Sequence, residues 1–240
     1  MTTEALRQKY EKPLEKVSSK TPRMFPFITR TWNPVKYCSH NCTYGWCPRY
    51  LDKEPTLREN RMHQRFLTND FVFVCDCGDL FCPEIPDEWI TRVIRVTNEN
   101  PQATFLFLTK APSWMYDWVK DMGLNCIIGA TIESDANYPS LSKAEPQKMR
   151  LQYMKAIHDK YPQKRLFVSI EPVLDFDLVC FELLLERLEP WAVAIGYDNY
   201  NHRLHEPRLS KAEKLRDDLR AAGIGVYEKT MRKAWWEESP

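Results

Sequence analysis

The sequence contains little that would suggest export, membrane insertion or flexible linkers. Only seven glycines occur in 240 residues, which predicts compact turns in place of flexible linkers. No apolar run approaches the roughly 18 residues that a membrane-spanning helix needs. The first stretch, MTTEALRQKYEKPLEKVSSK, is charged where a signal peptide is apolar. We therefore expect no membrane association and a cytoplasmic location.

Net charge gives no general case for binding nucleic acid. The formal charge is +1, yet residues 1–36 contain eight Lys or Arg against three Glu, while residues 70–99 contain seven acidic residues against two Arg. We expect residues 1–24 to form a basic N-terminal arm and residues 25–240 to form one domain. Such an arm is usually a solvated tail, and contact with phosphate is the alternative.

Short apolar runs recur along the chain and alternate with helical patterns. The runs occupy residues 25–29, 71–75, 104–109, 126–131, 166–170, 191–195 and, more weakly, 224–228. They are continuous and rich in Val, Ile and Phe, which is typical of strands buried on both faces of a parallel sheet. Strands that alternate with helices predict right-handed βαβ units. We therefore predict an α/β fold, a partial (β/α)6-type TIM barrel with a mostly parallel sheet; an open doubly wound sheet is the alternative.

Three segments between the runs have helical signals. Ile90, Val93 and Ile94 form one apolar stripe, and Met149, Tyr153, Ala156 and Ile157 form another. Near the end of the chain, Ser210 and Glu213 have the spacing of a capping box, Leu215 and Leu219 share one face, and Gly223 predicts the end of the helix.

Nearly every apolar run ends in polar residues. In parallel α/β architectures the working face lies at the carboxyl ends of the strands. The residues there predict a lined cavity, and they include Gly78, Asp79, Lys110, Thr131, Glu133, Ser134, Ser169, Glu171, Tyr227 and Lys229.

Eight cysteines in a reducing compartment are not expected to form a disulfide framework. Cys126 and Cys180 lie among apolar residues, where we predict buried core thiols. Near the second strand, burial is the default for Cys75, Cys77 and Cys82, with a second metal site or a reactive thiol as alternatives.

The most crowded stretch is CSHNCTYGWC, which begins at Cys38 and continues through Cys42 to Cys47 with the spacing C-x3-C-x4-C. Structural zinc normally takes four ligands, and His40 would have to supply the fourth. Three thiolates from one loop suit a [4Fe–4S] cluster with one iron left open for a small molecule. Both interpretations place a metal at the mouth of the predicted barrel.

A barrel whose first strand leads into three cysteines resembles the radical S-adenosylmethionine superfamily. Its usual pattern is C-x3-C-x-aromatic-C, and Trp46-Cys47 provides an aromatic–Cys ending here, although four residues rather than two separate the last two cysteines. The motifs TWNPVKYCSHNC, FVFVCDCGDLF, TFLFLTKAP, IIGATIESD, RLFVSIEPVL and AAGIGVYEK resemble an uncharacterised, phage-associated branch of that superfamily, over roughly residues 28–231.

The resemblance implies a cofactor set and a site. Cys38, Cys42 and Cys47 would ligate a [4Fe–4S] cluster whose electron cleaves S-adenosylmethionine to a 5′-deoxyadenosyl radical. Contacts to S-adenosylmethionine are implied for Trp46, Gly78, Asp79, Thr131, Glu133, Ser134 and Ser169. The resemblance also implies an electron donor such as a flavodoxin or ferredoxin.

The sequence does not name the substrate. The candidates for contacting the substrate are Lys110, Glu171, Tyr227 and Lys229. The alternative role of Lys229 is a structural ion pair with Glu171. The basic N-terminal arm and the phage association favour a nucleic-acid-linked substrate, and a partner protein that completes the substrate site is left open. The alternative function is a non-catalytic zinc or iron–sulfur module that docks a partner.

Overall fold

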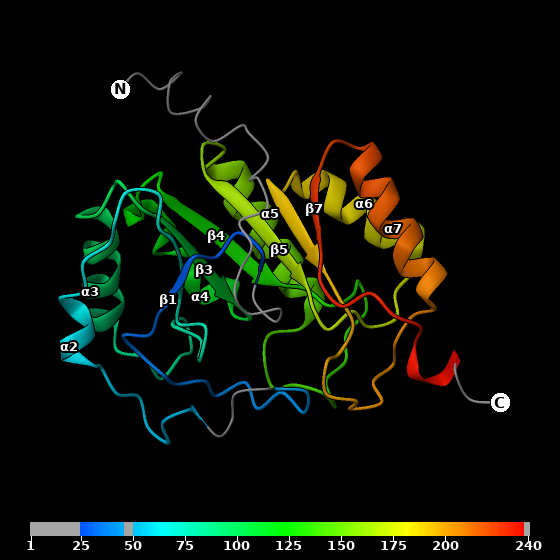
Figure 1. Ribbon diagram of the computed structural model, residues 1–240, viewed down its shortest axis with the longest axis horizontal. Coiled ribbons are helices and arrows are strands. Elements are labelled where there is room, and N and C mark those ends of the chain that lie inside the picture. Colours follow the sequence, from blue (N-terminus) through cyan, green and yellow to red (C-terminus); the bar gives the residue numbers. More distant parts are fainter. Residues whose placement is uncertain (1–24, 46–49, 238–240) are drawn as a thin grey trace.

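A single parallel sheet forms the centre of the computed structural model, which describes residues 25–45 and 50–237 (Figure 1). Its strands are β1 (Arg30–Trp32), β2 (Phe71–Val74), β3 (Thr104–Thr109), β4 (Cys126–Thr131), β5 (Arg165–Ile170), β6 (Ala192–Ile195) and β7 (Gly225–Glu228). They pair in chain order from β1 to β7, and every neighbouring pair is parallel. The sheet curls into a half-barrel, so the predicted α/β partial TIM barrel is confirmed.

The helices follow the strands and cover the outer face of the sheet (Figure 1). They are α2 (Glu59–Met62), α3 (Asp87–Asn98), α4 (Pro112–Tyr116), α5 (Gln147–Lys160), α6 (Leu178–Leu188) and α7 (Leu209–Ala221), with 3-10 turns η2 (Val119–Asp121) and η3 (Trp235–Glu237). In the part of the chain that the structure describes, no helix is long and apolar enough to cross a membrane. The predicted basic arm, residues 1–24, lies outside the described residues.

The strand predictions hold except for the first. The runs at 104–109 and 126–131 coincide with β3 and β4, whereas β1 begins at Arg30, after the run predicted at 25–29. Residues 25–28 form a turn in which the Ile28 N–H donates to the Phe25 carbonyl at 3.0 Å. Phe25 and Phe27 are buried against Phe167 inside the half-barrel. This run is therefore apolar because it fills the barrel rather than because it joins the sheet.

Two cores lie on opposite faces of the sheet, because successive strand residues point to opposite sides. Leu106, Ile127 and Phe167 belong to the inner core with Phe25 and Phe27. The alternate strand residues pack outward against the helices. Polar residues follow the carboxyl ends of the strands, at the mouth of the half-barrel.

Two helix predictions need correction. The buried stripe of α5 contains Leu151, Met154 and Ile157, so the predicted stripe keeps only Ile157 on the buried face. The end of α7 is as predicted, with Leu215 and Leu219 buried and Gly223 at a φ of 84°. Its start differs: α7 begins at Leu209, before the predicted Ser210 cap, and the Leu209 N–H donates to the Glu237 carboxylate at 2.9 Å.

The two cysteines predicted as core thiols differ in environment. Cys126 is buried in β4, as predicted, whereas Cys180 is exposed on α6. The apolar residues around Cys180 are helical, and the buried face of α6 carries Phe181, Leu185 and Leu188. A continuous apolar run therefore did not distinguish the buried from the exposed face of this helix.

Candidate functional site

The cysteine loop follows β1 and lies at the carboxyl ends of the strands, near the lower edge of Figure 1. Its described cysteines, Cys38 and Cys42, are both half-buried. The other two predicted site residues of this loop, Trp46 and Cys47, lie outside the described residues.

Backbone hydrogen bonds tie the cysteine loop to the loop after β4. The Lys143 N–H donates to the His40 carbonyl at 2.7 Å, and the Thr43 N–H donates to the Leu141 carbonyl at 2.8 Å. The loops that follow β1 and β4 are thus joined across the barrel mouth.

The Cys38 thiol contacts Cys82, from the loop after β2. A hydrogen bond from Cys82 lowers the pKa of Cys38 to about 7, and the same bond raises the pKa of Cys82. Because the proton stays on Cys82, the Cys38 sulfur has thiolate character near neutral pH. A thiolate is the form of cysteine that ligates metals.

Asp79 is a buried hydrogen-bond acceptor that joins three strand ends. Its Oδ2 lies 2.7 Å from His40 Nε2, and its carboxylate accepts bonds from the Thr109 hydroxyl and from the N–H groups of Phe81 and Lys110. Burial raises its pKa, but the charge and hydrogen bond of His40 outweigh burial and hold the pKa below the usual range. The ionised carboxylate therefore fixes the loops after β1, β2 and β3 relative to one another.

Gly78 allows the cysteine loop to pass close to the end of β2. A Cβ atom at position 78 would lie 2.8 Å from the Tyr37 carbonyl oxygen. The same oxygen accepts a hydrogen bond from the Asp79 N–H at 2.8 Å. A side chain at position 78 would force the two loops apart.

Lys110 and Glu133 form the centre of a buried ionic cluster. The Lys110 Nζ lies 2.5 Å from Glu133 Oε1, and Arg150 Nη1 lies 2.8 Å from Glu133 Oε2. The Tyr44 hydroxyl donates to Glu133 Oε1 at 2.6 Å and accepts a bond from Lys110 at 2.8 Å. The cluster therefore contains two cations, one carboxylate and one hydroxyl.

The ionisation of this cluster is set by its own charges. Burial raises the pKa of Glu133, but Lys110 and Arg150 outweigh burial and lower it to about 2. Burial lowers the pKa of Lys110, but Glu133 raises it above its ordinary value. Burial also raises the pKa of Tyr44, so its hydroxyl stays protonated and can donate.

Sequence reasoning missed Tyr44 and Arg150 as members of this cluster. Tyr44 follows Cys42 by two residues, where the usual C-x3-C-x-aromatic-C pattern has its aromatic residue. Gly45 therefore stands where that pattern has its third cysteine. The alignment of Tyr44 with the aromatic position of the pattern could have identified Tyr44 as a site residue. Arg150 gave no such signal, because an arginine in a helix is usually exposed.

Glu171 and Lys229 form a second ion pair at the same mouth. Lys229 Nζ lies 2.5 Å from Glu171 Oε2 and 4.8 Å from the centre of the Phe25 ring. Burial raises the pKa of Glu171 above its usual range, although Lys229 acts in the opposite direction. The structural ion pair considered for Lys229 is present. The half-buried Tyr227 packs against the inner core, with its ring centre 4.9 Å from that of Phe27.

The hydroxyl residues predicted at the site have different surroundings. Thr131 and Ser169 are buried partners in the register of β4 and β5, at the ends of these strands. Ser134 Oγ donates to the Asp175 carbonyl at 2.6 Å and accepts a bond from the Ala136 N–H. Ser134 thus stabilises the loop after β4.

The three cysteines near β2 do not form a metal site with one another. Strand β2 ends at Val74, and Cys75 adopts a φ of 54°, so the alternation of side chains along β2 does not extend to Cys77. Cys75 is buried, and burial raises its pKa to about 12. Cys82 instead contacts Cys38 and His40.

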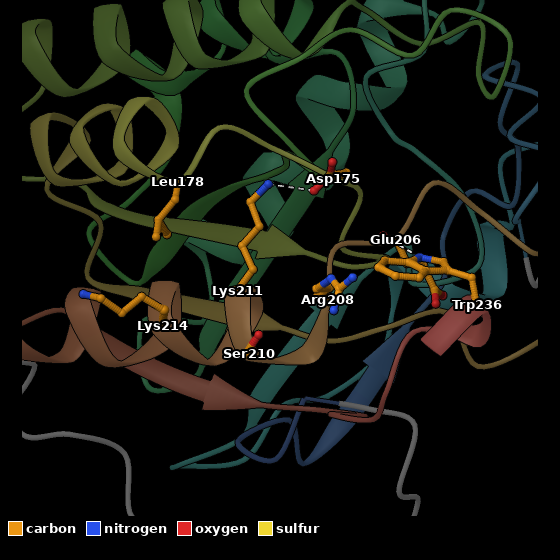
Figure 2. A pocket seen from close by; sticks show the side chains of 8 residues that line it. All are labelled: Asp175, Leu178, Glu206, Arg208, Ser210, Lys211, Lys214 and Trp236. Carbon is orange, nitrogen blue, oxygen red and sulfur yellow. Dashed lines mark hydrogen bonds and ion pairs between the residues drawn. The ribbon is translucent and has the colours of Figure 1, made fainter. Parts of the chain in front are cut away.

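A cavity of about 450 Å³ lies between the start of α6, the start of α7 and η3 (Figure 2). Lys211 on its wall pairs with Asp175 at 2.8 Å, and the Trp236 indole donates to the Glu206 carbonyl at 3.0 Å. None of the predicted site residues lines it. The candidate site is therefore the polar mouth of the half-barrel.

Comparisons with known proteins give a family and a fold. The family model described as "Protein of unknown function (DUF5131)" matches residues 45–238. The search of curated proteins finds no match to the sequence.

Among solved structures, a mutant of spore photoproduct lyase has a TM-score of 0.60 and 11% identity, and the match covers 90% of this chain and 79% of the lyase. Streptococcus suis SuiB bound to S-adenosylmethionine has a TM-score of 0.59 and 10% identity, with 84% of this chain and 50% of SuiB covered. HydG, a maturase of the [FeFe]-hydrogenase, has a TM-score of 0.53 and 12% identity, with 94% of this chain and 63% of HydG covered.

These neighbours are radical S-adenosylmethionine enzymes. The chain spans only half the length of SuiB. Other structures show the lyase complexed with dinucleoside spore photoproduct and SuiB bound to its precursor peptide SuiA. At such low identity, the likeness establishes a shared fold.

Proposed function

The chain belongs to the DUF5131 family of proteins of unknown function, and we propose that it is a radical S-adenosylmethionine enzyme. The observation that carries the proposal is a cysteine loop that follows the first strand of a partial barrel and lies at the same mouth as two ion pairs, Lys110 with Glu133 and Lys229 with Glu171. The assignment to a phage-associated branch with a C-x3-C-x4-C loop is part of this proposal and rests on the sequence motifs.

In this proposal Cys38, Cys42 and Cys47 hold a [4Fe–4S] cluster. The thiolate character of Cys38 suits such a ligand. Cys42 lies 3.1 Å from the Ser142 hydroxyl and close enough to Lys110 to raise the pKa of that lysine. When bound, the cluster supplies the electron that cleaves S-adenosylmethionine and yields a 5′-deoxyadenosyl radical.

The chain's own work in this function is to bind, to orient and to exclude water. The proposed contacts to S-adenosylmethionine are Trp46, Gly78, Asp79, Thr131, Glu133, Ser134 and Ser169. Charges that are already paired and held in place can orient a zwitterionic ligand without further reorganisation. The residues proposed to contact the substrate are then Lys110, Glu171, Tyr227 and Lys229.

The reducing partner and the substrate belong to the same proposal. We propose a flavodoxin or ferredoxin as electron donor. We also propose a cytoplasmic location, since the cysteines of the described residues are free thiols. A nucleic-acid-linked substrate is supported by the basic residues before β1 and by the dinucleoside in the lyase structure. The peptide in the SuiB structure makes a peptide substrate the competing outcome.

Anaerobic reconstitution tests the function. We expect about four irons per chain in the wild type, loss of most iron in Cys42→Ser, and release of 5′-deoxyadenosine when the reduced protein meets S-adenosylmethionine. Cys180→Ser is the matched control, because this cysteine is exposed on α6 and should leave the iron content unchanged. A colourless protein that holds only zinc, or a cluster that never cleaves the cofactor, contradicts the proposal.

A second candidate function is a metal-binding module without radical chemistry, which docks a partner. The observation that favours it is the convergence of Cys38, His40 and Cys82. Iron content and cofactor cleavage distinguish this candidate from the first.

A further inference from the structure

Two arginine–tryptophan pairs join the loop after β6 to the 3-10 turn η3. The Arg203 guanidinium lies 5.9 Å from the ring centre of Trp235, and the Arg208 guanidinium lies 5.2 Å from that of Trp236. Trp235 is 37% exposed, and both arginines are exposed as well. These four residues, which we call the Arg–Trp surface, therefore present aromatic rings and cations to solvent together.

Hydrogen bonds hold the Arg–Trp surface in place. Trp235 Nε1 donates to the Leu204 carbonyl at 2.8 Å, and Trp236 Nε1 donates to the Glu206 carbonyl at 3.0 Å. The Arg232 guanidinium, between β7 and η3, forms two bonds with the buried Glu206 carboxylate, at 2.7 and 2.9 Å. Because the rings are already oriented, a ligand that stacks on them restricts little further side-chain motion.

The two segments that build this surface carry net positive charge. Residues 199–211 and 230–237 contain five Lys or Arg against two Glu. Both glutamates are engaged within the protein, since Glu206 pairs with Arg232 and Glu237 accepts two backbone N–H groups. A polyanion is therefore the ligand whose charge complements the surface.

The second arginine–tryptophan pair also lines the cavity of about 450 Å³ described above. Figure 2 shows the Arg208 guanidinium beside the Trp236 ring, with Lys211 and Lys214 on the same helix. Sites for small ligands measure about 300–1,000 Å³. The cavity can therefore accept a single nucleotide beside cations and an aromatic ring.

The loop after β6 also reaches the barrel mouth. Asn199, in the same loop as Arg203, donates from its side-chain amide to Glu171 Oε1 at 3.3 Å and accepts a bond from the Thr230 hydroxyl at 2.5 Å. Glu171 is paired there with Lys229. A ligand bound along this loop thus extends toward a pair that is proposed to contact the substrate.

We propose that the Arg–Trp surface binds a single-stranded nucleic acid. Unstacked bases lie on the tryptophan rings, and the neighbouring guanidinium groups contact the phosphates. A duplex keeps its bases stacked and offers this surface only its phosphates, and an acidic peptide has no bases to stack. Binding itself does not require the cluster, whereas the assignment of the bound nucleic acid as substrate rests on the proposed function.

Fluorescence anisotropy of a labelled oligothymidine of about 15 nucleotides tests the binding to the full-length chain. Trp235→Ala should weaken affinity about 10-fold or more, because one stacked base is lost. Trp235→Phe keeps an aromatic ring without the indole N–H and should retain most of the affinity. Arg203→Ala should weaken binding and reduce the slope of log affinity against log salt concentration by about 0.7, as expected for one lost phosphate contact.

Trp114→Ala on α4 and Arg95→Ala on α3 are the matched controls, because both side chains are exposed and lie outside the surface. Both variants should bind like the wild type, and circular dichroism reports whether each variant folds. Wild-type affinity in Trp235→Ala would overturn the proposal. So would an equal loss in Trp235→Phe and Trp235→Ala, since the indole hydrogen bond would then be the cause. Equal binding of a duplex, or competition by polyglutamate as strong as that by unlabelled oligothymidine, would also overturn it.

Oligonucleotide binding and cofactor cleavage together separate this inference from the proposed function. Both are measured on the chain before and after anaerobic reconstitution. If the chain binds the oligonucleotide but holds no cluster, the Arg–Trp surface stands and the proposed function fails. If the chain cleaves S-adenosylmethionine but binds no oligonucleotide, the proposed function stands and this inference is wrong.

Discussion

The Lys110 ammonium lies 2.5 Å from the Glu133 carboxylate and so connects the loops after β3 and β4 across the mouth of the half-barrel. The other carboxylate oxygen accepts a bond from Arg150 on α5 at 2.8 Å. Because the Glu133 side chain is buried, its charge depends on these two cations in place of water. Glu133, in the loop after β4, therefore links the loop after β3, through Lys110, to helix α5, through Arg150.

Replacing Glu133 by Gln should strongly destabilise the fold. The change leaves the Lys110 and Arg150 charges without a carboxylate, and breaking a buried pair in this way costs about 3–5 kcal/mol. Urea unfolding at neutral pH measures the loss. Glu189→Gln is the control, since the side chain of Glu189 is 75% exposed and its change should cost less than about 0.5 kcal/mol. Equal losses in both variants would contradict the role assigned to Glu133.

Acid should remove the same stabilisation over a defined range of pH. The Glu133 pKa is about 2 in the folded chain against an ordinary value of 4.5, so between these values the unfolded chain binds more protons. The ionised Glu133 therefore contributes its full stabilisation above about pH 4.5. As the pH falls from there toward 2, the free energy of unfolding decreases by about 3 kcal/mol. Subtracting the unfolding free energy of Glu133→Gln from that of the wild type, across pH, isolates this slope. Parallel curves for the two proteins would refute the prediction.

Lys229→Met should destabilise the chain most at neutral pH. The change leaves the largely buried Glu171 carboxylate, which is 17% exposed, without a cation, and this costs about 3 kcal/mol at pH 7. Burial already raises the pKa of Glu171, and loss of Lys229 raises it further. A carboxyl group with a raised folded pKa stabilises the fold below its unfolded pKa, and this contribution is lost as pH rises.

The unfolding free energies of Lys229→Met and wild type should therefore converge near pH 4 and diverge toward pH 7. Lys214→Met is the control, because Lys214 is largely exposed in its pair with Asp218, and a surface pair contributes about 0–1 kcal/mol. A Lys229→Met penalty that is constant with pH would count against the pairing.

Gly78→Ala should displace the cysteine loop. The added methyl group would lie 2.8 Å from the Tyr37 carbonyl oxygen, and both atoms belong to tightly tied loops. We expect a loss of about 1–3 kcal/mol in the free energy of unfolding. Gly225→Ala in the edge strand β7 should cost less, since its nearest neighbouring atom would be 3.3 Å away. If Gly78→Ala is as stable as the wild type, the close approach of the loops does not require glycine.

Local sequence pattern predicted most of the sheet. Buried parallel strands need continuous apolar runs, so 104–109 and 126–131 marked β3 and β4 to the residue. The run at 25–29 misled because an aromatic plug inside a barrel has the same local composition as a buried strand. Cys180 was placed in the core for a related reason, since the run around it did not reveal which face of α6 is buried.

By itself, the sequence determined the parallel α/β architecture, the cysteine-rich loop and the kinds of residue that end each strand. Only the tertiary structure decided which of them interact: His40 with Asp79, Lys110 with Glu133, and Cys38 with Cys82. Each pair joins different strand ends, and Arg150 reaches Glu133 from a helix. The physical reason is that a hydrogen bond or buried ion pair depends on distance and burial in space, and the curl of the sheet sets both.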